Sequence, residues 1–165
     1  MFVILLVALS YSCEKDEYVR VKFDEKTFLE QKQLWQSSIT MNYQYDLFTG
    51  GFLLYHGRIT VENGDFAKEE ILNEYSHISI PESYSTIDKI YDTIEETFNN
   101  NNGKKKSDFY IREISVEYDK INHIPTSIVK HYYASPKLEV DGNFSFSITN
   151  FDRLQKWELH KKELE

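Results

Sequence analysis

The chain has 165 residues and a formal net charge of −8, and aromatic residues make up 15% of it. This length suits a single domain with its own core, and the aromatic content excludes a disordered chain. The acidic balance argues against nucleic acid as a partner and against electrostatic docking on anionic lipid, because both require a basic surface.

An unbroken apolar run at residues 2–9 is followed by a short spacer and by Cys13, the only cysteine. The run is too short for a membrane span, which needs roughly 20 residues, and it fits the apolar region of a secretory signal. Together these features resemble a bacterial lipoprotein signal. The resemblance implies removal of residues 1–12, lipid such as palmitate on Cys13, and a membrane-anchored protein of the bacterial cell envelope, either periplasmic or surface-exposed. The alternative is an apolar N-terminal element that packs into the fold.

Residues 13–23 are then expected to form the lipidated end and a tether or irregular lead-in, and residues 24–165 a single domain. A first helix is predicted at 24–37, with Asp24 as its N-cap. Strict alternation of apolar and polar residues next predicts a strand at 39–47. The apolar positions on one face of this strand are Ile39, Met41, Tyr43, Tyr45 and Leu47.

Two further strands are expected at 53–61 and 66–72. The pair Asn63 and Gly64 lies between them, and Asn-Gly between two strands is the strongest short hairpin signal. Gly57 lies inside the first of these strands and marks a candidate β-bulge.

The clearest helical pattern of the chain spans residues 85–99. Its apolar stripe consists of Ile87, Ile90, Tyr91, Ile94 and Phe98. Ser85, with Asp88 three residues later, is the predicted N-cap, and the stretch of Asn and Gly at 99–103 is a C-terminal stop signal.

Three more strands are expected at 110–118, 126–134 and 144–149, and a charged tail at 151–165. The order of helix, three strands, helix, three strands predicts an α+β domain made of two helix-plus-three-strand units. The strands are expected to form an antiparallel sheet with the helices packed on one face.

Four sequence blocks, in this order, resemble an uncharacterised family of bacterial lipoproteins that is known only as a domain of unknown function. The blocks are Trp35 with Asn42-Tyr43-Gln44-Tyr45, then Ile59-Thr60-Val61-Glu62-Asn63-Gly64, then Ser85-Thr86-Ile87-Asp88, and last Val116-Glu117-Tyr118-Asp119 with Ile124-Pro125-Thr126-Ser127-Ile128. The resemblance covers most of the chain after Cys13 and implies the fold and the envelope location, without an activity. The family usually has Gly at the position of His123.

The sequence holds no recognisable catalytic constellation. The five histidines are not spaced as metal ligands, and the motifs of serine hydrolases, phosphate-binding loops and dinucleotide-binding folds do not occur. No catalytic residue, cofactor or metal is therefore predicted. Asp119 and Asp141 are candidate binding residues because both fall in loops near strand ends, although Asp119 is also suited to cap its turn.

These features favour a lipid-anchored, non-enzymatic module of the cell envelope. Its expected partners are the membrane, through Cys13, and an unknown protein or peptide bound at an exposed sheet edge or face. One alternative is a protease or hydrolase inhibitor of the same build, which would show a dominant exposed loop. The other is an enzyme with dispersed residues, which would show a deep pocket lined by Asp, His and Tyr.

Overall fold

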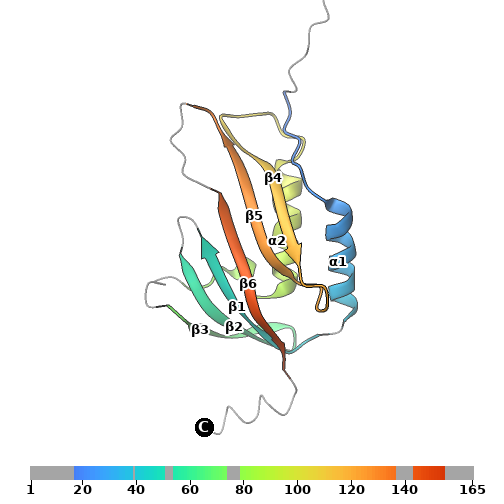
Figure 1. The fold of residues 1–165 in the computed structure, drawn as a ribbon, viewed down its shortest axis with the longest axis vertical. Coiled ribbons are helices and arrows are strands. Elements are labelled where there is room, and N and C mark those ends of the chain that lie inside the picture. The colour runs from blue at the N-terminus through green and yellow to red at the C-terminus, as the bar shows by residue number, and fades with distance from the viewer. Residues whose placement is uncertain (1–16, 39, 51–53, 74–78, 137–142, 155–165) are drawn as a thin grey trace, which may run out of the picture.

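The computed structural model describes residues 17–38, 40–50, 54–73, 79–136 and 143–154. These residues form one antiparallel sheet of six strands, with two α-helices (Figure 1). The elements in chain order are α1 (Glu25–Ser37), β1 (Tyr43–Gly50), β2 (Tyr55–Glu62), β3 (Asp65–Ile71), the 3-10 helix η1 (Glu82–Tyr84), α2 (Ile87–Asn101), β4 (Phe109–Tyr118), β5 (Pro125–Ala134) and β6 (Phe144–Arg153).

The expectation of an α+β domain made of two helix-plus-three-strand units is wrong. The strand order is β3-β2-β1-β6-β5-β4, so the last strand of the chain pairs with the first and joins both halves into one continuous sheet. The physical reason is that two separate three-stranded units would each leave a further edge with unpaired backbone groups, and the pairing of β1 with β6 removes both edges. The sheet, and not a helix-plus-strand unit, dominates the domain.

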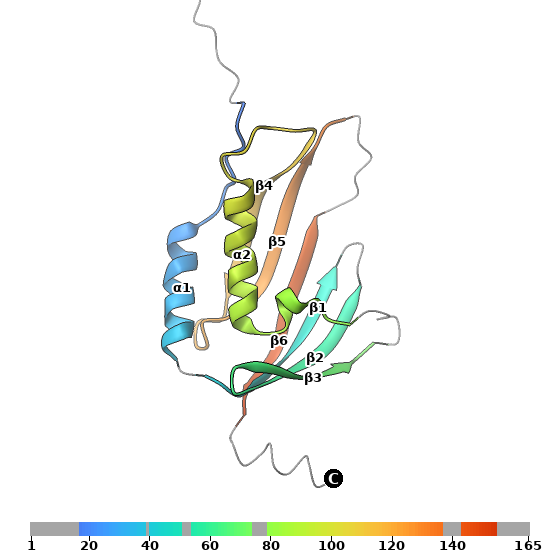
Figure 2. The same cartoon turned by 180° about the vertical axis from the view of Figure 1, so that it is seen from behind.

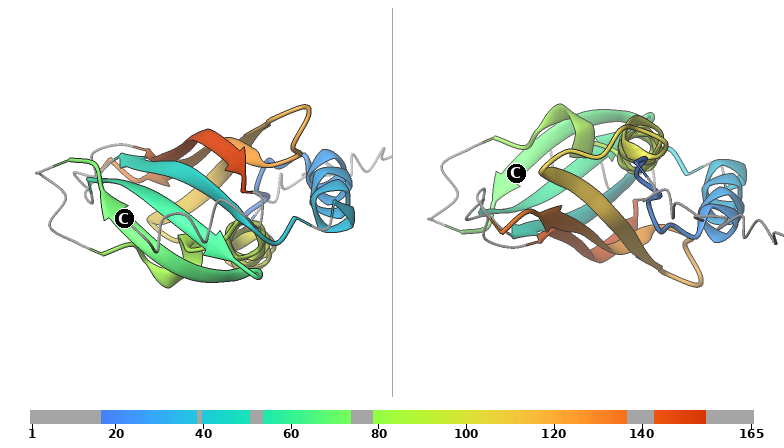
Figure 3. Two further views of the ribbon diagram at one scale, coloured as in Figure 1. Left: turned by 90° about the horizontal axis from the view of Figure 1, so that it is seen from below. Right: turned by 90° about the horizontal axis from the view of Figure 1, so that it is seen from above.

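The core lies between the helices and one face of the sheet, which we term the inner face (Figure 2). Four positions of the expected α2 stripe are buried, and this confirms the amphipathic pattern. These positions are Ile87, Ile90, Tyr91 and Ile94. On β1, Tyr43 and Tyr45 are at most 1% exposed, so both belong to the core. The opposite face, termed the outer face, carries neither α1 nor α2, and the sheet is strongly twisted (Figure 3).

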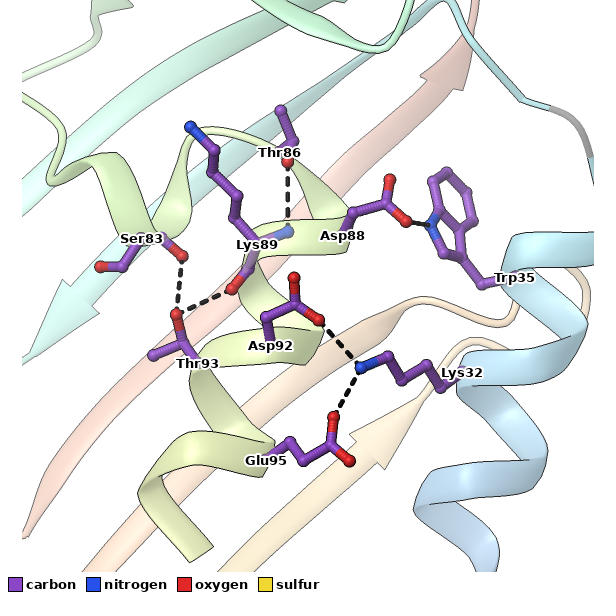
Figure 4. Close-up of polar contacts among 9 residues, drawn as sticks. All are labelled: Lys32, Trp35, Ser83, Thr86, Asp88, Lys89, Asp92, Thr93 and Glu95. Carbon is purple, nitrogen blue, oxygen red and sulfur yellow. Dashed lines mark hydrogen bonds and ion pairs between the residues drawn. The ribbon is translucent and has the colours of Figure 1, made fainter. Parts of the chain in front are cut away.

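A row of polar contacts joins α1 to α2 (Figure 4). The ammonium of Lys32 donates to the carboxylates of Asp92 at 2.9 Å and Glu95 at 2.7 Å. The indole N–H of Trp35 donates to Asp88 at 3.2 Å. Burial lowers the pKa of Lys32, but the two carboxylates outweigh burial and raise it. The half-buried ammonium therefore stays charged between the helices.

Both helices begin with a side-chain cap. The carboxylate of Asp24 accepts a hydrogen bond from the backbone N–H of Thr27 at 3.1 Å, which confirms the predicted N-cap of α1. The N-cap of α2 is Thr86, whose hydroxyl accepts from the backbone N–H of Lys89 at 3.2 Å. The predicted cap Ser85 is wrong, because its hydroxyl donates to a carbonyl of η1 at 2.7 Å and closes that preceding turn.

Residues 17–23, the described part of the expected tether or lead-in, run along the free edge of β4. The backbone N–H of Lys22 donates to Arg112 at 2.9 Å, and the N–H of Ile114 donates to Lys22 at 3.0 Å. Val19 is only 2% exposed. This segment covers an edge that would otherwise leave ladder groups of β4 unpaired.

Two strand boundaries differ from the expected ones. Met41 lies before β1 and is 50% exposed, so its predicted inward position is wrong. β6 runs on to Arg153 because an irregularity in the β1–β6 ladder, where Asn150 has a φ of 50°, lets pairing resume beyond Thr149. The first part of the expected tail, residues 151–153, is therefore strand. Residues 155–165 and Ile39 lie outside the described residues.

The predicted hairpin turn at Asn63 and Gly64 is confirmed, with φ values of 54° and 87°.

The β4–β5 turn holds His123 at a φ of 57°, in the left-handed region that favours glycine. Its ring Nδ1 lies 3.0 Å from the side-chain oxygen of Gln31 on α1.

We expect His123→Ala to lower the free energy of unfolding by about 1 kcal/mol, because the contact with Gln31 is lost and the cost of the left-handed backbone conformation remains. His123→Gly loses the same contact but removes that cost, so it should be about 1 kcal/mol more stable than the alanine variant. Urea denaturation measures both. An alanine variant at least as stable as the glycine variant would contradict the assignment.

Candidate functional site

Asp119, one of the two predicted binding residues, lies in the β4–β5 turn. Its carboxylate accepts hydrogen bonds from the backbone N–H groups of Ile121, at 2.9 Å, and Asn122. These bonds hold the pKa of Asp119 below its ordinary value, the bond from Asn122 contributing most. The carboxylate thus caps its own turn. The other predicted residue, Asp141, and the predicted lipidation site, Cys13, lie outside the described residues.

A cavity of about 210 Å³ lies between the lead-in, the start of α1 and β4. It is lined by Lys22, Phe23, Asp24, Thr27, Glu113, Ile114, Ser115, Val116 and Tyr118. Its lining contains Asp and Tyr but no His, and its charged groups are already engaged. The Lys22 ammonium bonds Glu113 at 2.8 Å, and the Asp24 carboxylate bonds Thr27. The cavity therefore lacks a free acid–base pair.

The outer face carries a fixed ion pair at its centre. Asp46 on β1 lies directly across from Arg58 on β2, and the guanidinium donates to both carboxylate oxygens, at 2.7 and 3.0 Å. The side-chain amide of Asn150 on β6 donates to the same carboxylate at 2.7 Å. Asp46 is only 4% exposed, whereas the side chain of Arg58 is 36% exposed. The pair therefore presents a fixed guanidinium to the outer face.

An exposed apolar patch adjoins this ion pair. It consists of the exposed side chains of Phe48, Leu54 and Leu72 together with the half-buried ring of His56, and we term it the outer patch. Phe48 lies across from His56 in the β1–β2 ladder, and their rings meet edge to face with centroids 6.0 Å apart. The backbone N–H of Leu72 donates to the carbonyl of His56 at 2.9 Å, which brings the end of the β3 segment to the same place. Three strands thus converge on one apolar surface.

The sequence did not reveal this site. The predicted strand ended at residue 47, so Phe48 was not assigned to either face of the sheet. The alternation of apolar and polar residues assigned Asp46 to the solvent side. Arg58 could be matched to Asp46 only with the β1–β2 register, which depends on the turn between the strands. The outward position of Asp46 was a usable signal, but only its 4% exposure identifies a paired carboxylate.

No group of three His, Cys, Asp or Glu side chains in the described ranges could hold a metal ion. Within those ranges, no helix is both long and apolar enough to cross a membrane.

Comparison with known proteins identifies the family of the chain but no activity. No curated protein and no solved structure matches the chain. Residues 27–153, from the first turn of α1 to the end of β6, match a family described as one of unknown function, DUF6174. This confirms the expected membership of a family of unknown function. The chain belongs to the DUF6174 family.

Proposed function

We propose that the chain is a lipid-anchored, non-enzymatic domain of the bacterial cell envelope that binds a protein or peptide through the outer patch. The observation that carries the proposal is the exposure of three apolar side chains on one helix-free face. Phe48 is 44% exposed, Leu54 55% and Leu72 37%. Contiguous apolar surface beside fixed polar groups is typical of an interaction site.

The charge beside the outer patch narrows the class of partner. The Arg58 guanidinium is partly exposed there, so a partner with an acidic group next to its apolar contact is favoured. The anchor is supported by the order of apolar run, spacer and Cys13 in the sequence. Acyl chains buried in the bilayer stabilise attachment by about 0.8 kcal/mol per CH2.

Site-specific photo-crosslinking in intact cells tests the binding surface. A photoreactive amino acid at Phe48 is expected to give an adduct of defined size, whereas the same group at Leu29 should give none. Leu29 is a matched control, since it is 48% exposed but lies on α1. Leu54→Glu should remove the adduct at position 48 without unfolding the domain. In washed membranes, higher salt should lower the yield of the wild-type adduct. Equal adducts from positions 48 and 29 would overturn the proposal.

The intact mass of the protein extracted from membranes tests the anchor separately. A diacyl or triacyl mass that begins at Cys13, and that is lost in Cys13→Ser, is the expected result. An unmodified chain that retains Met1 would refute the anchor and would leave the crosslinking result unaffected.

A further inference from the structure

The lead-in pairs with only the first part of the outer edge of β4. Its last backbone contacts with the strand are those of Lys22, which bonds Arg112 and Ile114. The chain then turns away from β4 and begins α1 at Glu25 (Figure 1). Among the described residues, no backbone hydrogen bond reaches this side of β4 beyond Ile114. We term the remainder of the edge, residues 114–118, the open segment of β4.

The backbone of the open segment points hydrogen-bonding groups away from the sheet. Along an antiparallel pair, the N–H and C=O of successive residues point alternately toward the partner strand and away from it. The N–H of Ile114 points away from β5, because it donates to Lys22 at 3.0 Å. The β4–β5 register is regular from Ile114 to Val116, so the N–H and C=O of Val116 also point away. These two groups have no backbone partner among the described residues, and such an edge is a template for an added strand.

The cavity of about 210 Å³ adjoins the open segment, which supplies Ile114, Ser115, Val116 and Tyr118 to its lining. This volume is below the roughly 300–1,000 Å³ of pockets that enclose a drug-sized ligand, so it suits a single side chain. Ile114 belongs to the buried core, and Val116, Tyr118 and the lining residue Phe23 pack against that core. The inner-face part of the lining is therefore apolar and favours an apolar side chain.

The charge left over beside the open segment is negative. Glu117 follows Val116 in the strand, so it points to the outer face, where it is exposed. Neither Glu117 nor Asp24 of the cavity lining belongs to any ion pair between described residues. Lys22, the cation of the lining, is paired with Glu113 at 2.8 Å. A basic group of a ligand would therefore find complementary charge here.

We propose that the open segment of β4 and the adjoining cavity bind an extended peptide of another protein, in which a basic residue precedes an apolar one. In an antiparallel arrangement, the peptide residue opposite Val116 exchanges two backbone hydrogen bonds with it and directs its side chain to the same face, into the cavity. The preceding peptide residue lies opposite Glu117 on the outer face, where its charge is complementary. This inference does not depend on the proposed function, since the outer patch lies on β1 to β3, at the other end of the strand order.

Amide hydrogen exchange of the isotope-labelled full chain, read by NMR, tests whether the open segment is free. The N–H of Val116 should exchange at least about tenfold faster than that of Ile114, which is bonded to Lys22. Equal protection of the two amides would show that the segment is already covered, and would overturn the proposal. Sedimentation would then show whether a second copy of the chain covers it.

The acetylated and amidated peptide Thr-Lys-Leu-Thr is the probe for the class of ligand. At about 10 mM, ten times a Kd of about 1 mM, it should shift the amide resonance of Val116 and slow its exchange. Three matched peptides should bind at least about tenfold more weakly. They carry glutamate in place of lysine, serine in place of leucine, or N-methylleucine, which lacks the backbone donor. A probe that leaves the Val116 amide unchanged, or four peptides that act alike, would overturn the proposal.

Variants of the chain test the charge and the backbone donor separately. Glu117→Lys should reverse the preference, so that the glutamate peptide binds better than the lysine peptide. Asp65→Lys is the matched control, because it makes the same change at an exposed position of β3, the opposite edge strand, and it should leave the preference unchanged. Val116→Pro removes the outward N–H, a change that an edge strand tolerates, and should abolish binding. An unchanged preference in Glu117→Lys would refute the basic residue, and the wild-type comparisons require no variant to fold.

Discussion

Gly57→Ala is expected to lower the free energy of unfolding by about 3 kcal/mol, although alanine is ordinarily the better strand residue. A Cβ added at Gly57 would lie 2.6 Å from the ring carbon Cζ of Tyr55 and 3.2 Å from the carbonyl oxygen of Glu70. Tyr55 is 1% exposed, so any movement of its ring disturbs the packed core. The methyl group would displace a buried aromatic ring, and the lost burial of that ring sets the size of the effect.

Two comparisons separate this steric cause from backbone conformation. Gly103→Ala should cost only about 1 kcal/mol, since Gly103 has a φ of 74° but no atom within 4 Å of an added Cβ. In a Tyr55→Leu background, Gly57→Ala should cost less than about 1 kcal/mol, because the Tyr55 ring atoms are gone and only the Glu70 carbonyl oxygen at 3.2 Å remains close. Urea denaturation of the four variants gives all the differences. A Gly57→Ala variant that is no less stable than Gly103→Ala would contradict the packing explanation.

Gly57 also shows how far pattern reasoning reaches inside a strand. The sequence suggested a bulge at this glycine, but the ladder passes through it in regular register, with Leu47 on one side and Ile71 on the other. The irregularity of the β2–β3 pair lies at Thr60 and Val61 instead. A glycine inside a strand indicates either a bulge or a close approach, and the sequence does not say which atoms approach.

Helix existence and strand alternation were predictable because they depend on residues close in sequence. The stripe of α2, the Asp24 cap and the Asn63–Gly64 turn are all local signals, and all three are confirmed. Strand order was not predictable in the same way. The pairing of β1 with β6 joins residues about a hundred positions apart, and no periodicity in either strand specifies which neighbour it takes. The expected two-unit architecture failed at this step.

The candidate site could not be predicted from the sequence for the same reason. Its ion pair draws one residue each from β1 and β2 and an amide from β6, and the last of these depends on a backbone irregularity at Asn150. Asp119, by contrast, binds backbone groups only two and three residues away, and its suitability as a turn cap was readable from the sequence. Local chemistry was predictable, and chemistry assembled across the sheet was not.

Asp46→Asn is expected to lower the free energy of unfolding by about 2 kcal/mol at pH 7, because a charge-assisted double hydrogen bond to Arg58 is lost. Burial raises the pKa of Asp46, but the hydrogen bonds from Arg58 and Asn150 outweigh burial and hold it below its ordinary value. Such a carboxylate contributes its full stability above the unfolded-state pKa of about 3.9, and the contribution is lost as the pH falls through the folded value.

Denaturant unfolding across pH therefore checks both the size and the sign. The difference between wild type and Asp46→Asn should be constant from neutral pH down to about pH 5 and should shrink below about pH 4. Asp65→Asn, at an exposed position in β3, is the control and should change stability by less than about 0.5 kcal/mol at any of these values. A difference that grows on acidification would contradict a lowered pKa for Asp46.

Arg58→Met should reverse this pH dependence, which makes it the sharper test of the pair. Without the guanidinium, burial of Asp46 is offset only by the amide of Asn150, so its pKa is expected to rise above the ordinary value. A carboxyl group whose pKa is higher in the folded state than in the unfolded state stabilises the fold at low pH, and this stabilisation is lost as the pH rises. The variant should therefore be more stable relative to wild type near pH 4 than near pH 7. In an Asp46→Asn background, Arg58→Met should cost the same at both pH values, since the carboxylate that titrates is gone. If Arg58→Met destabilises the domain equally at both pH values, the guanidinium is not what keeps the Asp46 carboxylate ionised.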